Sequence, residues 1–462
     1  MNEWTVAASF AVRDVGLRRP REGESVTAAS GQSLTVPVTQ KREFWVLLAY
    51  AVVLGVFGAF TALIFVGLIT VGGTWYSDSD PGWFGGHWWW VAVAVAAGIA
   101  VGLVRRLTRL PWQTPGLFDD LQTGKVEVGL VPGIAAVSAV SLIGGASLGP
   151  EKALGSMGGG LGSWIARRRA LKSEDAQVTT LAGFAGAYGG LFSSTLIVVM
   201  LIMEVARPGG QRFAKSLAAT IVASSVSFGI YFVIAGAVFL DYYQVPQYDF
   251  KDWHLLAGVL LGLFAAVLVT VLAAVTMAAA RLFGRLKVPD IAKSVLGAVV
   301  FGVLGVALPL TMFSGGDQLK TVLDGAETLG LGLLVATLIA KMLAFGVSQG
   351  SGFVGGPIFP SLFIGGTAGV IVHEVIPGVP LGLAFTCVLA ATPGALAAAP
   401  FSMVLLAAFL SQVGALETAP ILIAVFTAFL TMEGVKYLLV SRRRARGAGA
   451  SATAGAEPAA PG

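Results

Sequence analysis

The feature that most constrains this chain is a glycine-rich block that occurs twice, at residues 145–162 and again at 352–369. At one separation of 207 positions, six residues of the first block recur unchanged in the second: Gly145, Gly149, Pro150, Gly158, Gly159 and Gly162. A constant separation across the whole block favours a true internal repeat, although 61 glycines raise the number of chance matches. Internal repeats in an apolar chain are typical of transporters, whose binding site lies where the repeats meet.

The composition is that of a membrane protein. The chain is 56% hydrophobic and 12% charged, against roughly 25% charged residues in soluble domains. Apolar stretches of about 20 residues, the length needed to cross the hydrocarbon core, recur along it. They cover residues 45–70, 88–104, 217–240, 255–280, 329–345 and 421–440. We therefore expect an all-α polytopic membrane protein, which excludes a soluble enzyme and a nucleic-acid-binding protein. The net charge of +5 is assigned to basic residues at the membrane faces.

The organisation along the chain is simple. We predict a polar, disordered N-terminus over 1–40, two membrane repeats over 41–245 and 246–441, and a disordered Ala/Gly/Pro-rich tail over 442–462. The N-terminal residues lack the apolar core of a signal peptide. Cys387 is the single cysteine, so the chain has no internal disulfide and no CxxC metal site. No cofactor is expected.

Charged and aromatic residues give an orientation. Arginine and lysine cluster around residues 105–109, 167–172, 281–287 and 442–446. Because such clusters remain on the cytoplasmic side, both termini are predicted to be cytoplasmic. The opposite side then receives residues 77–80 with their tryptophan-rich flank, and residues 241–249. We expect an integral protein of the plasma membrane.

The repeated block carries the chemistry of the candidate site. Many apolar segments are short or broken by Gly and Pro, which predicts helices that stop within the membrane. Gly149-Pro150 and Gly356-Pro357 each predict such a helix start. The free N–H groups and the dipole of a helix start favour an anion. Two such starts meeting near mid-membrane would hold an anion without a fixed Arg or Lys.

The two copies differ at one informative position, where Glu151 in the first corresponds to Ile358 in the second. A carboxylate at an anion-attracting helix start can occupy the site itself, or become protonated and move aside. Ionisable residues inside a membrane are candidates for function. Glu151 is therefore a candidate gate and proton carrier. The alternative is that it only complements the dipole of its own helix.

At these residues the chain resembles the CLC family of anion channels and anion/proton exchangers. The motifs that carry the resemblance are Ser147-Leu-Gly149-Pro150-Glu151 with the glycines that follow, Gly355-Gly356-Pro357-Ile358-Phe359-Pro360, Ser314-Gly315-Gly316 and Glu204-Val205-Ala206-Arg207-Pro208. The resemblance spans roughly residues 44–440. It implies a fold of two inverted repeats with broken, tilted helices, and a homodimer with one pathway per subunit. It also implies that Glu151 is the gate, and that Gly149, Ile358 and Phe359 line the anion site.

Several positions depart from the family pattern. Pro150 stands where the family has Arg or Lys, and Lys152 stands where it has Gly. Lys152 could raise the local positive potential or pair with a carboxylate. The best match to the family's serine motif is Gln113–Leu117, so the resemblance implies Thr114 and Pro115 as anion ligands, with a simple interfacial turn as the alternative. Tyr437 is the candidate for the family's ion-coordinating tyrosine, with an interfacial position as the alternative.

Two questions of function stay open in the sequence. Exchangers of the family usually carry a second Glu after the position of Glu204, and Val205 stands there instead. This favours passive chloride or other anion conduction, with Glu204 as a candidate inner proton relay if the protein is a proton-coupled antiporter. A rival from another class is an intramembrane serine hydrolase, because Gly145-Ala-Ser147-Leu-Gly149 matches the G-x-S-x-G pattern. It would need one of His87, His254 or His373 as its base.

Overall fold

The computed structural model describes residues 42–78, 88–236 and 242–454. Over these residues the chain is helical, and the extended pairing found there is a single bridge between Gly149 and Gly356. The α-helices are α1 (Arg42–Asp78), α2 (Trp89–Thr108), α3 (Leu117–Thr123), α4 (Val131–Ile143), α5 (Glu151–Arg168), α6 (Ser173–Leu191), α7 (Thr195–Ala206), α8 (Gln211–Ala235), α9 (Trp253–Arg285), α10 (Asp290–Ala307), α11 (Gly316–Asp324), α12 (Leu331–Gly350), α13 (Ile358–Val375), α14 (Leu381–Ala397), α15 (Pro400–Ser411) and α16 (Thr418–Ala454). Short 3-10 turns, η4 (Val128–Leu130) and η5 (Pro309–Thr311), precede α4 and α11.

Eight helices among the described residues are long and apolar enough to cross a membrane. Six of them overlap the apolar stretches seen in the sequence, and the other two are α10 and α13. Four further apolar helices are shorter, namely Val128–Ile143, α7, α14 and α15. Helices of this length do not span about 30 Å of hydrocarbon. The expectation of an all-α membrane fold with broken helices is thus confirmed.

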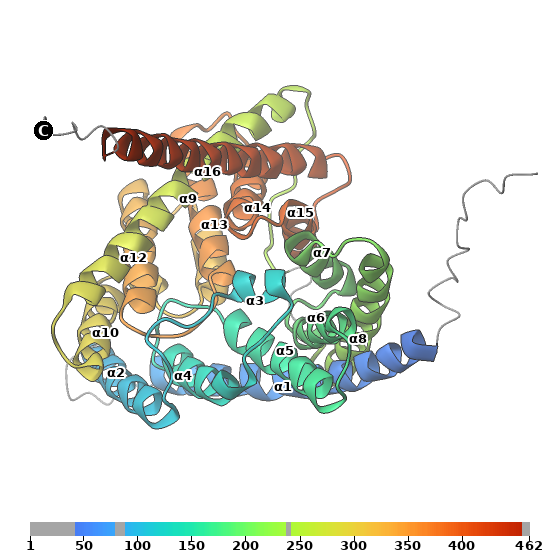
Figure 1. The fold of residues 1–462 in the computed structure, drawn as a ribbon. Helices are drawn as coiled ribbons and strands as arrows, with labels where there is room; N and C mark the ends of the chain where they lie inside the picture. The colour runs from blue at the N-terminus through green and yellow to red at the C-terminus, as the bar shows by residue number, and fades with distance from the viewer. Residues whose placement is uncertain (1–41, 79–87, 237–241, 455–462) are drawn as a thin grey trace, which may run out of the picture.

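The helices form two halves that pack side by side (Figure 1). The first half runs from α1 to α8 and the second from α9 to α16, with the predicted boundary at residue 245 in the segment between α8 and α9. The halves meet through α2 against α10 and α7 against α15. The repeated blocks form α5 and α13, which begin near the centre of the molecule.

Close helix packing in the first half depends on glycine. A Cβ at Gly58 of α1 would lie 2.1 Å from the backbone carbon of Gly186 in α6. A Cβ at Gly158 of α5 would lie 2.3 Å from the carbonyl oxygen of Gly183, also in α6. Small residues let helix backbones approach closely in lipid, where no hydrophobic difference drives association. The many glycines of the chain are therefore packing residues as well as helix breakers.

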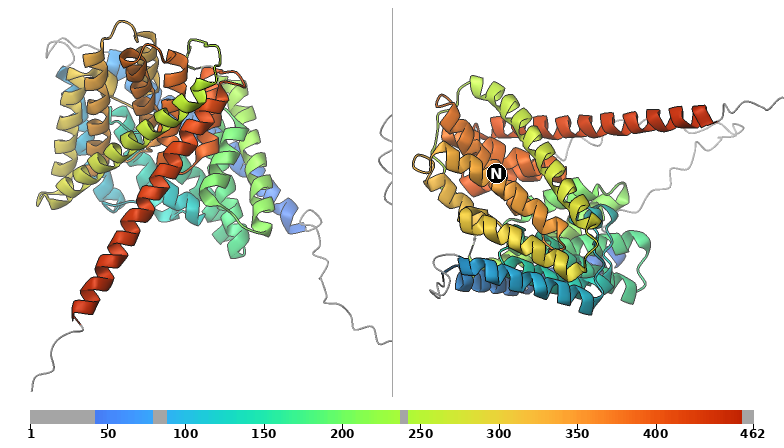
Figure 2. Two further views of the ribbon diagram at one scale, coloured as in Figure 1. Left: turned by 90° about the horizontal axis from the view of Figure 1, so that it is seen from above. Right: turned by 90° about the vertical axis from the view of Figure 1, so that its left-hand side faces the viewer.

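The last helix extends well beyond the rest of the bundle (Figure 2). α16 continues to Ala454 and so includes much of the 442–462 segment that composition predicted to be disordered. Arg and Ala, which fill this stretch, have high helix propensity, which outweighs the intervening glycines. Residues 455–462 and the N-terminal segment 1–40 lie outside the described residues.

The glycine contact between α1 and α6 gives a first prediction. Gly58→Val should lower the thermal unfolding midpoint of the detergent-solubilised protein, because an over-packed helix contact costs about 1–3 kcal/mol. Gly67→Val is the matched control on the same helix, since a Cβ there meets nothing within 4 Å. Equal midpoints for the two variants would contradict the close approach of α1 and α6.

Candidate functional site

The two repeats meet in a reciprocal backbone contact. The N–H of Gly149 donates to the carbonyl of Gly356 at 2.8 Å, and the N–H of Gly356 donates to the carbonyl of Gly149 at 2.6 Å. Gly149 and Gly356 are equivalent positions of the repeat. The contact is therefore self-complementary, as expected across a two-fold axis.

A second pair of hydrogen bonds obeys the same symmetry. Ser141 Oγ accepts from the N–H of Val354 at 3.2 Å, and Ser348 Oγ accepts from the N–H of Ser147 at 3.3 Å. Each residue of the first bond is 207 positions from its counterpart in the second, the separation of the glycine blocks. These serines satisfy backbone donors in the loops that lead to the helix starts, which a membrane interior requires.

Both helices of the site begin where the Gly-Pro pairs predict. α5 starts at Glu151 after Pro150, and α13 starts at Ile358 after Pro357. Each proline stands at the N-cap position, where the backbone amide would have no intrahelical partner in any case. The first amides that can face a ligand are therefore those of Glu151 in α5 and of Ile358 and Phe359 in α13.

The carboxylate of Glu151 occupies this position at the start of α13. Its Oε1 accepts a hydrogen bond from the Phe359 N–H at 2.8 Å, and the residue is fully buried. Its Oε2 makes no hydrogen bond with the described residues. A Cβ added at Gly149 or at Gly356 would lie 2.0 Å from that oxygen, so the two bridging glycines leave room for the carboxylate.

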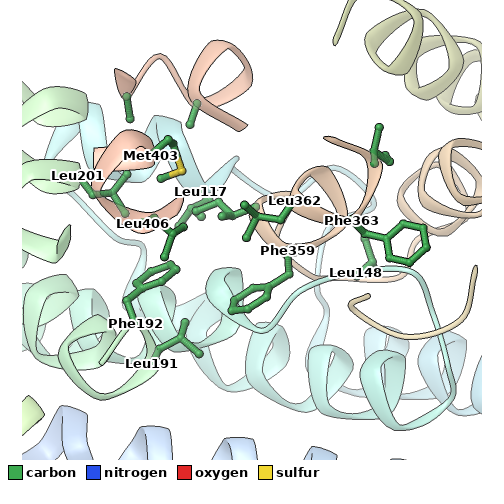
Figure 3. Packing of buried hydrophobic residues seen from close by; sticks show 14 of the residues in the cluster. Leu117, Leu148, Leu191, Phe192, Leu201, Phe359, Leu362, Phe363, Met403 and Leu406 are labelled. Atoms are coloured by element: carbon green, nitrogen blue, oxygen red, sulfur yellow. The ribbon is translucent and has the colours of Figure 1, made fainter. Parts of the chain in front are cut away.

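Aromatic residues pack beside the starts of α5 and α13. The Tyr188 hydroxyl of α6 donates to the main-chain carbonyl of Glu151 at 3.0 Å. The ring of Phe192 stacks on that of Phe359, with centroids 6.1 Å apart and planes 5° apart. Figure 3 shows these two rings beside Leu117 and Leu362. Apart from the Tyr188 hydroxyl, these side chains are hydrocarbon, and the donor to the Glu151 carboxylate is the Phe359 amide.

A cavity of about 360 Å³ lies on one side of this region. Its lining includes Pro150, directly before Glu151, together with Phe313, Ser314 and Asp317. The cavity extends to the residue that precedes the buried carboxylate. We call it the outer vestibule.

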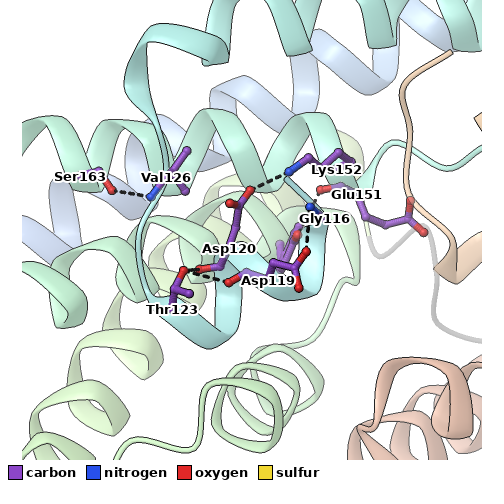
Figure 4. A network of polar contacts seen from close by, with 9 residues as sticks. Gly116, Asp119, Asp120, Thr123, Val126, Glu151, Lys152 and Ser163 are labelled. Carbon is purple, nitrogen blue, oxygen red and sulfur yellow. Dashed lines mark hydrogen bonds and ion pairs between the residues drawn. The ribbon is translucent and has the colours of Figure 1, made fainter. Parts of the chain in front are cut away.

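Lys152 pairs with a carboxylate. Of the two alternatives that the sequence left open for this residue, a raised positive potential or an ion pair, the structure has the ion pair. Its Nζ lies 2.6 Å from Asp120 Oδ2 of α3, and both side chains are buried. Figure 4 shows Lys152 directed toward Asp120 and the Glu151 carboxylate directed away from both. Because Asp120 balances its charge, Lys152 adds little net positive potential at the site.

Three residues implied by the family resemblance do not contact Glu151. Thr114 is half-buried and Pro115 is exposed, both in the irregular segment before α3. Tyr437 is 74% exposed on α16. This exposure agrees with the interfacial alternative for Tyr437.

Glu204 acts as a helix cap. Its two carboxylate oxygens accept from the N–H groups of Phe401 at 2.7 Å and Ser402 at 2.8 Å, at the start of α15. Val205 beside it is buried. The Glu204 carboxylate therefore joins α7 to α15 across the two halves.

The serine of the G-x-S-x-G pattern has no base beside it in the described residues. Ser147 Oγ is buried and makes no hydrogen bond there. His254 accepts from the Lys251 N–H, and His373 Nδ1 contacts the carbonyl of Val379. His87 lies outside the described residues.

Sequence reasoning missed Tyr188, Phe192 and Asp120. Tyr188 lies on the glycine-rich helix α6 and Phe192 is its C-cap residue, and neither belongs to a motif that would have marked it in the sequence. Asp120 and Lys152 are charged residues in an apolar chain, and their pairing could have been proposed on that ground. Extending the repeat to Ser141 and Ser348, which keep the separation of 207, would have found the serine contacts.

The fold and the site together define a membrane protein for anions, with two repeats whose helix starts meet at a buried carboxylate. The family model for voltage gated chloride channels matches residues 113–433. The chain belongs to this family, the CLC proteins, and its function is CLC-type anion transport.

Curated relatives and solved structures agree with this assignment. The chain is 27% identical over 350 residues to the "Putative ion-transport protein YfeO" of Escherichia fergusonii, covering 73% of this chain and 81% of that protein. It is 28% identical over 308 residues to YfeO of Escherichia coli, covering 65% and 71%. A slow cyanobacterial Cl⁻/H⁺ antiporter has the same fold, with a TM-score of 0.73, 19% identity and coverage of 86% and 98%. A CLC-type fluoride/proton antiporter gives a TM-score of 0.65, 15% identity and coverage of 84% and 95%.

The buried pair of Lys152 and Asp120 gives a second prediction. Asp120→Asn should destabilise the protein by about 3–5 kcal/mol, because it leaves a buried ammonium without its carboxylate. The double variant Asp120→Leu/Lys152→Met should recover most of this loss, since it removes both charges. Unfolding in detergent by heat or denaturant measures both effects.

Glu433→Gln is the matched control, because its partner Lys436 is half-exposed on α16. An exposed pair contributes about 0–1 kcal/mol, so this variant should unfold close to wild type. If Asp120→Asn is as stable as Glu433→Gln, the pair does not join α3 to α5 in the way described.

Proposed function

We propose that this protein conducts chloride or a similar small anion through each subunit, with Glu151 as the gate. The observation that carries the proposal is the hydrogen bond from the Phe359 N–H to Glu151 Oε1. In this arrangement the carboxylate takes the place that a permeating anion would take at the start of α13. An anion and the Glu151 carboxylate therefore compete for the same donors.

The chemistry of opening follows from the partners of the carboxylate. Protonation removes its negative charge and weakens its hold on the Phe359 amide, because a charge-assisted hydrogen bond is roughly twice as strong as a neutral one. The side chain then leaves, and the amides of Ile358 and Phe359 with the dipole of α13 receive the anion.

Glu151→Gln tests the gate. The neutral amide mimics the protonated carboxyl group and cannot titrate, so anion flux from chloride-loaded liposomes should lose its dependence on external pH. We expect flux in the variant at neutral pH to match or exceed the acid-stimulated flux of wild type. An unchanged pH profile in Glu151→Gln would overturn the gate assignment.

Passive conduction is our first choice of transport mode. Val205 replaces the carboxylate expected on an inner proton path, and Glu204 is held as a cap by two amides of α15. The second candidate is an anion/proton antiporter with Glu151 as its proton carrier. It is favoured by the two antiporters that share this fold.

Glu204→Gln separates the two modes. As a cap, the residue should contribute about 0.5–2 kcal/mol to stability, and its loss should lower the unfolding midpoint. Under passive conduction, Glu204→Gln should not change the proton movement that accompanies anion flux. Proton movement is recorded as external pH in the same liposomes. A proton signal in wild type that disappears in Glu204→Gln would reverse our choice and make this residue the inner relay. Glu433→Gln, on the partly exposed face of α16, is the control for removal of a carboxylate.

Several finer features belong to the same proposal. Basic residues at the ends of α2, α5 and α9 support a cytoplasmic position for these ends, and hence for both termini, in the plasma membrane. The family supports a homodimer. Membership of a transport family supports the absence of enzymatic activity, and Ser147 is then a loop residue whose N–H bonds to Ser348. Thr114, Pro115 and Tyr437 remain candidate anion ligands.

A further inference from the structure

A lysine lies fully buried inside the second half of the protein. Lys341 of α12 is 0% exposed, and its Nζ contacts the carbonyl oxygens of Thr311, Met312 and Phe313 at 3.2, 3.2 and 2.9 Å. The same nitrogen lies 4.8 Å from the centroid of the Phe363 ring. Neither the repeat nor the gate accounts for this side chain.

The contacts of Lys341 match the donors of a charged ammonium. An ammonium has three N–H donors, one for each of the three carbonyls, whereas a neutral amine has only two and would turn a lone pair toward an oxygen. The face of an aromatic ring attracts a cation and completes the surroundings. The site therefore fits a cation on all of its sides.

The other buried lysines of the described residues are balanced by carboxylates. Lys152 pairs with Asp120 and Lys215 with Asp175, each at 2.6 Å. Over residues 42–78, 88–236 and 242–454, Lys341 has no Asp or Glu oxygen within 4.0 Å. As an ammonium, Lys341 would be solvated by carbonyl dipoles without being neutralised, and its field would extend into the surrounding protein.

Lys341 lies close to the anion path on two sides. The loop that it holds contributes Phe313 and Ser314 to the outer vestibule, whose lining also includes Pro150. The N–H of Phe313 donates to the carbonyl of Gly145, at the beginning of the loop to Glu151. On the other side, Phe363 is one helical turn beyond Phe359, whose amide holds the Glu151 carboxylate.

We propose that Lys341 is a fixed buried cation that raises the affinity of the Glu151 site for its anion and holds the inner wall of the outer vestibule in place. It is a positioning residue that acts through its field and through the loop of residues 311–313, without touching the anion. The proposal rests on the location of the anion site at Glu151. It does not require that Glu151 be the gate.

The test is the anion concentration that gives half-maximal flux in liposomes, measured for Lys341→Met, Lys341→Gln and Lys341→Arg. Coulomb's law with an effective dielectric constant near 20 gives a change on the order of tenfold for a unit charge about 10 Å away. We therefore expect half-saturation to rise about tenfold in both neutral variants, and to stay near wild type in Lys341→Arg. Lys341→Gln keeps donors for the carbonyls, so it separates loss of charge from loss of the loop contacts.

Lys172→Met is the matched control, because it removes an exposed lysine by the same substitution. A merely structural role for Lys341 predicts less folded protein and a lower maximal flux, with an unchanged half-saturating concentration. That result in Lys341→Gln, checked for folding by size-exclusion chromatography, would overturn the proposal. So would equal shifts in Lys341→Gln and in the control.

A second variant leaves Lys341 in place in case its substitutions do not fold. Ser314 lines the vestibule next to Phe313, so Ser314→Asp introduces a carboxylate that opposes the field of Lys341. Half-saturation should rise several-fold in Ser314→Asp and stay at the wild-type value in Ser314→Asn. Equal values for the two variants would refute a field acting from this loop.

The Glu151→Gln background separates this proposal from the gate. If Glu151→Gln keeps the wild-type pH profile while Lys341→Gln still shifts half-saturation, the gate assignment fails and the role of Lys341 stands. If Glu151→Gln loses the pH dependence and Lys341→Gln leaves half-saturation unchanged in both backgrounds, the gate stands and the role of Lys341 fails.

Discussion

Two hydrogen bonds between the backbones of Gly149 and Gly356 hold the functional centre together. Each loop leaves regular helix inside the membrane, where an unpaired N–H or carbonyl costs several kcal/mol. The backbone groups of Gly149 and Gly356 pair with one another. The hydroxyls of Ser141 and Ser348 accept hydrogen bonds from two further N–H groups of these loops. The broken helices of one repeat therefore depend on those of the other.

The site arises from one difference within this symmetric frame. Ile358 leaves the start of α13 without a side-chain acceptor, whereas Glu151, its counterpart, reaches across the two-fold axis to the Phe359 amide. Glycine at 149 and 356 is needed twice over, for the backbone contact and for the space taken by the carboxylate. The symmetric scaffold thus provides the N–H donors at the helix starts. Glu151 is the single acidic residue whose carboxylate binds one of them.

The buried basic side chains fall into two groups, those paired with carboxylates and those bound to main-chain carbonyls. Lys152 and Lys215 are neutralised by aspartates and join neighbouring helices. Lys341 binds carbonyls of the loop before α11, and Arg105 binds the carbonyls of Gly352 and of the loop before α3. Each of these two side chains binds main-chain oxygens of irregular segments. The paired charges join helices to one another, and the two carbonyl-bound side chains join helices to loops.

The sequence by itself determined the class, the helical fold and the helix starts, because apolar length, Gly-Pro breaks and the repeat act through local backbone physics. It singled out Glu151 for the same reason, since a carboxylate in an apolar repeat stands out against Ile358. Only the tertiary structure decided what each side chain meets. It gave Glu151 the Phe359 amide, Lys152 the Asp120 carboxylate and Glu204 the start of α15, and it left Tyr437 exposed on α16. Those contacts join residues far apart in the chain, and their distances depend on helix packing, which no local pattern encodes.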